Sequence, residues 1–295
     1  MREPVFTGAC VAIVTPFTDT GVDYDQLGKL IEMQIAGGTD AICICGTTGE
    51  ASTQSMEEHL ETIRYCTEKV AGRVKVIAGT GANNTMEALH LSLEAEKYNV
   101  DGLLMVTPYY NKASQAGLIQ HYTYVADRVH TPIILYNVPS RTGTTIQPET
   151  FKALAQHPMI NGCKEASGNF SALARSMSLC PKDFYFWSGN DDQVVPMMAL
   201  GGKGVISVVS NVWPEIMAKM TRLALEGNFE EATKVQLEIL PLCDALFCEV
   251  NPIPVKGAMN MMGLNAGKLR LPLCEMSDAH KEQVRKTLIQ YGLLK

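Results

Sequence analysis

The stretch Met159-Ile160-Asn161-Gly162-Cys163-Lys164-Glu165-Ala166-Ser167-Gly168 is a short, largely apolar strand that ends in a lysine and then turns. Lysine is rarely buried without a partner, because burial disfavours its charged form. Lys164 therefore has two interpretations. Its amine reaches water or pairs with a carboxylate such as that of Glu165, or it is held neutral so that it attacks a carbonyl carbon and forms a Schiff base.

Seven further segments resemble this strand, and a pattern typical of a helix follows each of the eight. The expected strands cover residues 8–15, 41–45, 74–78, 102–107, 132–136, 159–164, 184–188 and 204–208. The expected helices cover residues 23–37, 55–70, 85–98, 115–129 and 169–179, with others near Pro148, after residues 189–192 and at Pro214. This alternation predicts a parallel α/β fold, either an open doubly wound sheet or a closed barrel. Eight units favour a (β/α)8 TIM barrel over residues 1–226.

The pattern changes after Gly227, where only helical segments follow. Helices are expected at about residues 228–248, 253–262 and 277–291. We predict that residues 227–295 form a small C-terminal all-helical domain. Lys256 belongs to this appendage, and we expect it to lie far from the strand ends and to have a structural role.

The composition excludes several classes of function. The 295 residues are 46% hydrophobic and carry a formal net charge of −6, which argues against nucleic acid or an anionic membrane as partner. The amino-terminal residues do not resemble a signal peptide, and no apolar run is long enough to span a bilayer. The nine cysteines show no paired metal-ligand spacing and are an odd number. Reduced thiols in a cytoplasmic protein are therefore expected.

Barrel active sites lie at the carboxyl ends of the strands, so these positions hold the candidate catalytic side chains. They are Thr47, Thr48, Tyr109, Tyr110, Tyr136, Arg141, Lys164, Ser188, Gly189 and the vicinity of Ile206. The set offers one amine, hydroxyls and phenols for proton transfer, and a guanidinium that suits a carboxylate. It contains no histidine and no metal-binding cluster, so a metal-dependent mechanism is not expected.

Each of these residues also has an ordinary structural explanation. Tyr136 ends the strand beside that of Lys164 and suits proton transfer, but it could equally be a core tyrosine. Thr47 and Thr48 lie between glycines and suit carboxylate binding, or they form a simple turn. Arg141 could hold a carboxylate bidentately, or be a solvated loop charge.

Taken together, the strand-end segments resemble the dihydrodipicolinate synthase (4-hydroxy-tetrahydrodipicolinate synthase) family, essentially from end to end. The resemblance rests on residues 46–50, 78–83, 106–111, 136–143, 164–169, 204–208 and 251–256. It implies a lyase of lysine and diaminopimelate biosynthesis with no cofactor other than a covalent Schiff base, in which Lys164 forms that Schiff base with pyruvate. The resulting enamine then attacks L-aspartate-4-semialdehyde.

The same resemblance implies roles for the remaining residues. Tyr136 would transfer protons in a relay with Thr47 and with Tyr110, which would reach in from a neighbouring subunit of a homotetramer, a dimer of dimers. Thr48 and the backbone near Ile206 would bind pyruvate, and Arg141 would orient the semialdehyde carboxylate. Gly189, at the end of the seventh strand, is a further candidate substrate-binding position.

Members of the family that are inhibited by lysine bind it at a subunit interface. The matching positions here are Ala51, Ser52, Met56, His59, Asn83, Glu87 and Tyr109. Met56 replaces the histidine that sensitive members often have. The sequence therefore predicts a possible lysine site without predicting inhibition.

Two alternative functions share parts of this pattern. N-acetylneuraminate lyase and keto-deoxy sugar-acid aldolases would share Lys164, Tyr136 and the Gly-Thr-Thr turn, but a sugar aldehyde calls for hydroxyl-binding groups instead of Arg141. A non-catalytic barrel that binds sugar acids would not need Lys164, Tyr136 and Thr47 together.

Overall fold

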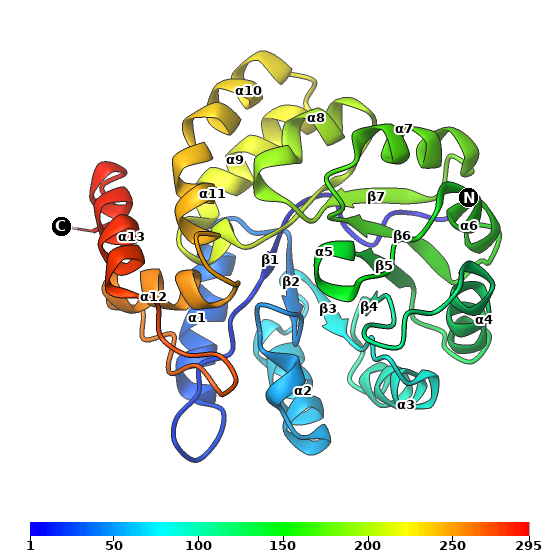
Figure 1. Cartoon of the computed structure of the whole chain (residues 1–295), viewed down its shortest axis with the longest axis horizontal. Coiled ribbons are helices and arrows are strands. Elements are labelled where there is room, and N and C mark those ends of the chain that lie inside the picture. Colours follow the sequence, from blue (N-terminus) through cyan, green and yellow to red (C-terminus); the bar gives the residue numbers. More distant parts are fainter. Residues whose placement is uncertain (295) are drawn as a thin grey trace.

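The computed structural model describes residues 1–294 and contains a closed barrel of eight parallel strands that pair in chain order, β1 to β8 (Figure 1). This confirms the predicted (β/α)8 barrel. The strands are β1 Gly8–Ala12, β2 Ala41–Ile44, β3 Lys75–Gly79, β4 Gly102–Val106, β5 Ile133–Asn137, β6 Ile160–Glu165, β7 Tyr185–Ser188 and β8 Gly204–Ser207. Each strand lies within a few residues of its expected position.

Helices surround the barrel and connect successive strands (Figure 1). They are α1 Tyr24–Ala36, α2 Met56–Val70, α3 Thr85–Glu96, α4 Gln115–Ala126, α5 Pro139–Thr142, α6 Pro148–Leu154, α7 Phe170–Leu179, α8 Val194–Ala199 and α9 Pro214–Leu225, with 3-10 turns η1 Ala51–Thr53, η2 Asp191–Gln193 and η3 Val209–Asn211. Local sequence determines several helix starts. The Ser55 hydroxyl, for example, caps α2 by accepting a hydrogen bond from the backbone N–H of Glu58. The short helix α5 was not predicted.

The C-terminal segment is helical, as expected, but its first predicted helix is wrong. Residues 228–248 form two helices, α10 Phe229–Glu238 and α11 Leu240–Leu246, followed by α12 Ile253–Met261 and α13 Asp278–Gln290. Pro241 causes the break, since it has no backbone N–H to donate within a continuous helix. Helix α10 packs on α8 and α9 of the barrel, and α13 packs on α11 and α12. The division at residues 226 and 227 stays a prediction, and Lys295 lies outside the described residues.

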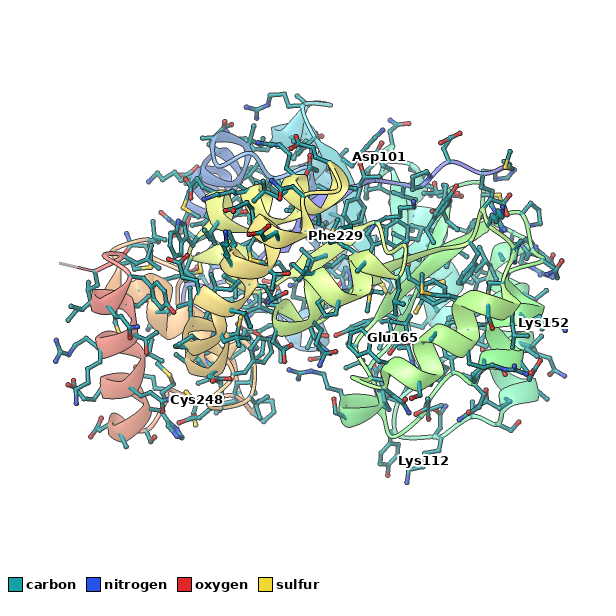
Figure 2. All side chains as sticks on the ribbon, turned by 90° about the horizontal axis from the view of Figure 1, so that it is seen from above. Asp101, Lys112, Lys152, Glu165, Phe229 and Cys248 are labelled. Carbon is teal, nitrogen blue, oxygen red and sulfur yellow. The ribbon has the colours of Figure 1, made fainter. Side chains whose placement is uncertain are left out.

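The barrel has two opposite faces, one formed by the amino ends of the strands and one by their carboxyl ends. In Figure 2, Asp101, which precedes β4, and Lys112, which follows it, lie at opposite edges of the molecule. At the amino-end face, the Arg2 guanidinium donates to the carbonyl oxygens of His157 at 2.8 Å and Ile160 at 2.6 Å, and forms a 3.0 Å ion pair with Asp183. These bonds fix the amino-terminal segment across that face and leave the carboxyl-end face for chemistry.

Two features of the described residues bear on earlier expectations. All nine cysteines are free thiols. Six are buried, namely Cys10, Cys43, Cys45, Cys66, Cys163 and Cys243, whereas Cys180 and Cys248 are half-buried and Cys274 is exposed. Among residues 1–294, no helix has the length and apolar character that crossing a membrane would require.

Candidate active site

Lys164 lies inside the barrel at the carboxyl end of β6. Its Cα is in register with that of Tyr136 on β5 and that of Trp187 on β7, so the three side chains face the same way. Lys164 is only 6% exposed, and its Nζ lies 4.4 Å from the centroid of the Tyr136 ring. The two residues that the sequence predicted to share a pocket are therefore in contact.

No hydrogen bond or ion pair holds the Lys164 amine within residues 1–294. The expected alternative partner, Glu165, is used elsewhere: its carboxylate accepts hydrogen bonds from Asn137 Nδ2 at 2.8 Å and from the backbone N–H of Ser167 at 2.6 Å. Burial raises the pKa of Glu165. An amine buried without a counter-ion is chemically suited to react as a neutral nucleophile.

Gly189 provides the space that the Lys164 side chain occupies. A Cβ at position 189 would lie 3.1 Å from Lys164 Cε and 2.7 Å from the Cβ of Ala166. The backbone N–H of Gly189 also donates to the carbonyl of Glu165 at 2.8 Å. The predicted substrate-binding position thus lies against the lysine itself.

A cavity of about 480 Å³ opens at the carboxyl ends of β2 to β5. Three candidate catalytic or binding residues, Thr47, Tyr136 and Arg141, line it together. Thr47 and Arg141 are exposed, whereas Tyr136 is buried in the barrel wall. Lys164 lies against Tyr136 and does not itself line the cavity.

The same cavity extends to most of the predicted lysine site. Ala51, Ser52, Met56, His59, Glu87 and Tyr109 line it, whereas Asn83 does not. His59 Nε2 lies 2.7 Å from the carbonyl oxygen of Gly79, and burial lowers the pKa of His59, so the ring is a neutral donor there. The amide of Asn83 donates to the carbonyl of Tyr109 at 3.2 Å.

Thr48 and Arg141 are connected by a residue to which sequence reasoning gave no role. Asn251, between α11 and α12, donates from Nδ2 to the Thr48 hydroxyl at 2.9 Å. Its backbone carbonyl accepts a 3.3 Å hydrogen bond from Arg141 Nη2. Asn251 is buried, and its Oδ1 has no partner in the described chain. The Asn-Pro-Ile-Pro-Val-Lys segment carried the resemblance, but only the fold shows that it reaches the strand ends.

Lys256 also lies at the strand ends, which corrects the expectation that it would be far from them. Its Nζ donates to Glu50 Oε1 at 2.7 Å and to the carbonyl oxygen of Thr15 at 3.0 Å. Both members of this ion pair are 1% exposed. The expected position was wrong because α12 returns to the loop after β2. Lys256 thus supports the loop that carries Thr47 and Thr48.

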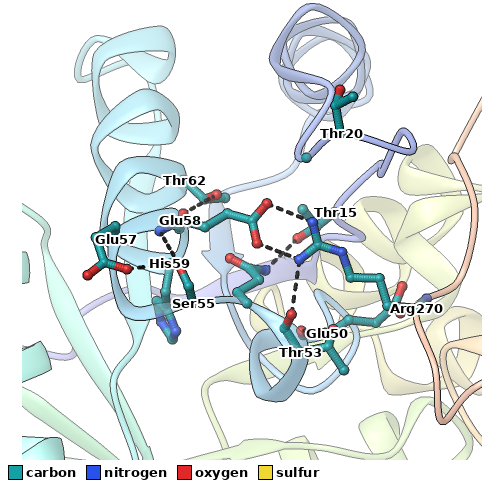
Figure 3. Close-up of polar contacts among 12 residues, drawn as sticks. Thr15, Thr20, Glu50, Thr53, Ser55, Glu57, Glu58, His59, Thr62 and Arg270 are labelled. Atoms are coloured by element: carbon teal, nitrogen blue, oxygen red, sulfur yellow. Dashed lines mark hydrogen bonds and ion pairs between the residues drawn. The ribbon is translucent and has the colours of Figure 1, made fainter.

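Arg270 supports this loop from the other side. Its backbone N–H donates to Glu50 Oε2 at 3.0 Å, and its guanidinium pairs with Glu58 and donates to the carbonyl of Thr53 at 3.0 Å (Figure 3). Glu50 has a φ of 52°, a left-handed conformation that is uncommon for a residue with a side chain. These bonds fix the backbone there.

The remaining candidates lie apart from the cavity lining. Ile206 is fully buried on β8, within the barrel interior that also holds Tyr136 and Trp187. Tyr110 has the opposite environment: it is 90% exposed and has a φ of 73°. The structure therefore does not bring Tyr110 together with Thr47 and Tyr136 within one chain. Residues 1–294 contain no group of three or more metal-ligating side chains.

An eight-stranded parallel barrel with an interior lysine at the end of its sixth strand, a phenol against that lysine and an arginine at the cavity above defines a class: (β/α)8 barrels suited to lysine-amine chemistry with a small carbonyl compound. Within this class the chain is similar to well-defined relatives. Residues 5–291 match the dihydrodipicolinate synthetase family, and the chain belongs to that family.

Individual relatives agree over the whole chain. The 4-hydroxy-tetrahydrodipicolinate synthase of Acetivibrio thermocellus is 53% identical and that of a Thermoanaerobacter species (strain X514) is 54% identical, covering 100% and 99% of both chains. The crystal structure of dihydrodipicolinate synthase from Aquifex aeolicus superposes with a TM-score of 0.96 at 45% identity, covering 98% of this chain and 99% of that one.

Proposed function

We propose that this chain is a 4-hydroxy-tetrahydrodipicolinate synthase, a lyase that condenses pyruvate with L-aspartate-4-semialdehyde for lysine and diaminopimelate biosynthesis. Relatives that are about half identical over full length and carry this name support the proposal. The observation on which it rests most directly is the buried Lys164 amine, which has no ionic partner among residues 1–294 and lies 4.4 Å from the centroid of the Tyr136 ring.

The first half of the reaction forms a Schiff base. The neutral Lys164 amine attacks the ketone carbon of pyruvate, and the oxygen is protonated and leaves as water. The product is a cationic iminium. Loss of a proton from the methyl carbon then gives a neutral enamine. The Tyr136 ring lies against the nitrogen, with its centroid 4.4 Å away, and we assign these proton transfers to its phenol. A hydroxyl relay with Thr47 fits general acid–base catalysis.

The second half makes the carbon–carbon bond. The enamine carbon attacks the aldehyde carbon of the semialdehyde, whose oxygen gains a proton. The amino group of the semialdehyde then attacks the iminium carbon and displaces the Lys164 amine, which closes the ring and frees the enzyme. We assign pyruvate binding to Thr48, Gly189 and the backbone near Ile206, and the semialdehyde carboxylate to Arg141, an exposed guanidinium at the cavity.

Tyr110 takes part in the proton relay with Tyr136 and Thr47 only when it comes from a neighbouring subunit. Its 90% exposure is what a residue that enters a neighbouring subunit would show. We therefore propose a homotetramer, a dimer of dimers, acting in the cytoplasm. The covalent chemistry of Lys164 supplies the electron sink, so we propose no cofactor. The cavity residues around His59 and Glu87 are retained as a possible lysine site, with Met56 as the position that departs from sensitive relatives.

The test is condensation by the purified protein of pyruvate with L-aspartate-4-semialdehyde, with N-acetylmannosamine as the competing aldehyde. We expect turnover of the semialdehyde alone. Turnover of the sugar would move the function to an N-acetylneuraminate lyase or a keto-deoxy sugar-acid aldolase, and turnover of neither would favour a non-catalytic barrel.

A paired set of variants tests the nucleophile. Lys164→Arg keeps a positive charge but cannot form the imine, so borohydride should trap no pyruvate on it. The control is Lys203→Arg, because the Lys203 amine also lies over a tyrosine ring, 5.8 Å from that of Tyr185, at the other end of the barrel. Normal trapping in Lys164→Arg would refute the assignment.

A further inference from the structure

Asp191 joins the ends of two strands beside the Lys164 strand. It follows β7, which pairs with β6, and its Oδ2 accepts hydrogen bonds from the backbone N–H groups of Val208 at 2.9 Å and Val209 at 3.0 Å, just after β8. Its backbone carbonyl accepts a 2.8 Å bond from Gln236 of α10. Asp191 is therefore held in one position by β7, β8 and the C-terminal helices.

This carboxylate is buried without a basic partner. Asp191 is 3% exposed, forms no ion pair within residues 1–294, and its Oδ1 has no hydrogen-bond partner there. A buried charge without a counter-charge is costly to folding. Its location at the carboxyl end of the barrel therefore points to a role in the reaction instead of in stability.

Lys164 is the basic group whose charge acts on the pKa of the Asp191 carboxyl. Burial raises the pKa of Asp191, whereas its hydrogen bonds and the charge of Lys164 oppose the rise. The backbone that leads to Asp191 touches the lysine, since a Cβ at Gly189 would lie 3.1 Å from Lys164 Cε. Asp191 lies two residues beyond this contact, and opposite charges interact more strongly in a site with little water than in solvent.

We propose that Asp191 is a positioning residue whose carboxylate is the counter-charge of the cationic iminium on Lys164. This inference rests on the proposed function. When the amine, the ketone and one proton combine to give the iminium and water, the positive charge stays on the nitrogen. At high pH the iminium loses that proton and becomes a neutral imine. Asp191 favours the cation and does so without touching pyruvate.

Other titratable groups surround the pair and must be considered. They are the thiols of Cys10 on β1, Cys43 on β2 and Cys243 on α11, the phenol of Tyr136 on β5, the carboxyl of Glu165 on β6 and the exposed carboxyl of Asp192. Burial raises the pKa of Cys43 to about 11, so this thiol stays neutral up to about pH 10, and burial also raises the pKa values of Cys10 and Cys243.

The test compares Asp191→Asn with Asp192→Asn, its exposed neighbour. The asparagine carbonyl can still accept both N–H bonds, so only the charge is removed. Borohydride reduces the iminium, and the trapped pyruvate is measured by mass spectrometry from pH 6 to pH 10. We expect trapping at neutral pH to persist, because the iminium loses its proton only at higher pH. The pH at which trapping is half lost should fall by about one unit, and Asp192→Asn should match the wild type.

The outcomes distinguish a failure of the proposed function from a failure of the role proposed for Asp191. A wild-type protein that traps no pyruvate contradicts the proposed function. If the wild type traps pyruvate and Asp191→Asn loses trapping at the same pH as the wild type, only the role of Asp191 is overturned. A uniform decrease in trapping at every pH, which a structural defect would cause, also overturns that role. If Asp191→Asn does not fold, Asp191→Ser, which keeps one acceptor, is measured in its place against the same expectation.

Discussion

The side-chain amide of Asn251 donates a 2.9 Å hydrogen bond to the hydroxyl of Thr48, although 203 residues separate them in the chain. The carbonyl of the same asparagine accepts from Arg141. One residue of the C-terminal segment thus holds a side chain assigned to pyruvate and a side chain assigned to the semialdehyde. The C-terminal helices are part of the site as well as its support.

We predict that Asn251→Ala weakens binding of pyruvate more than binding of the semialdehyde. Loss of the side-chain hydrogen bond frees the Thr48 hydroxyl, and the KM for pyruvate should rise about tenfold, equivalent to about 1.4 kcal/mol, whereas the backbone carbonyl that accepts from Arg141 remains in the variant. Steady-state kinetics measure this. Asn260→Ala is the control, since Asn260 is exposed and bonds only the carbonyl of Gly267. An unchanged KM for pyruvate would show that the Asn251 side chain does not hold Thr48 in its binding position.

Gly189→Ala should impair the chemistry and leave the fold intact. The added methyl group would lie 2.7 Å from the Cβ of Ala166 and 3.1 Å from Lys164 Cε, so Ala166 must shift and the lysine must move by a few tenths of an ångström. We expect kcat to fall at least about tenfold, because small displacements of reacting groups are costly. Gly117→Ala provides the control, since its new Cβ meets nothing closer than 3.5 Å. A wild-type kcat in Gly189→Ala would contradict the assigned contact.

Removing the Lys256 amine should destabilise the protein strongly. Lys256→Met leaves the Glu50 carboxylate buried and unpaired, which costs about 3–5 kcal/mol. Urea unfolding measures the loss. Lys268→Met removes an exposed ion pair with Asp19 and should change stability by less than about 1 kcal/mol. Equal losses of stability in the two variants would mean that the buried ion pair contributes no more to stability than the exposed one.

His121 should make the fold sensitive to acid. Its Nδ1 lies 2.9 Å from the Thr85 hydroxyl, its Nε2 is buried with no partner in the described part of the chain, and burial lowers its pKa to about 4. The unfolded chain binds the proton near pH 6.5, so this contribution is complete above pH 6.5 and is lost as pH falls towards 4.

The size of this effect follows from the difference between the pKa of His121 in the folded chain and its pKa in the unfolded chain. Between pH 7 and pH 4.5 the contribution of His121 to the free energy of unfolding should fall by about 2 kcal/mol. Urea unfolding at the two pH values measures the total change, and His121→Gln should reduce it by that amount. His130→Gln, at an exposed histidine, should leave it unchanged. A wild-type pH dependence in His121→Gln would disprove the effect.

The barrel and the contact between Lys164 and Tyr136 could be predicted because both depend on short-range rules. Strand and helix periods identified eight units, and consecutive strands of a barrel are neighbours, so the ends of β5 and β6 had to be adjacent. Gly189 was found in the same way, as a residue at a strand end. The sequence could not show why it is a glycine, since this depends on the position of the Lys164 side chain.

The contacts of Asn251 and Lys256 could not be predicted, because they depend on the path of the chain beyond the barrel. Lys256 was expected far from the strand ends, yet it bonds Glu50 and Thr15 there. No periodic pattern encodes a contact between such distant segments. The break before α11 is different: Pro241 was visible in the sequence and indicated that a helix could not run unbroken through residues 228–248.

The single cavity that joins Arg141 to His59 and Glu87 has a consequence for inhibitor design. A carboxylate aimed at Arg141 and an amine aimed at the Glu87 carboxylate could belong to one bivalent molecule whose linker runs through about 480 Å³ of continuous space. Once one end is bound, the other meets its target at a high effective concentration, so two weak fragments could together make a tight ligand.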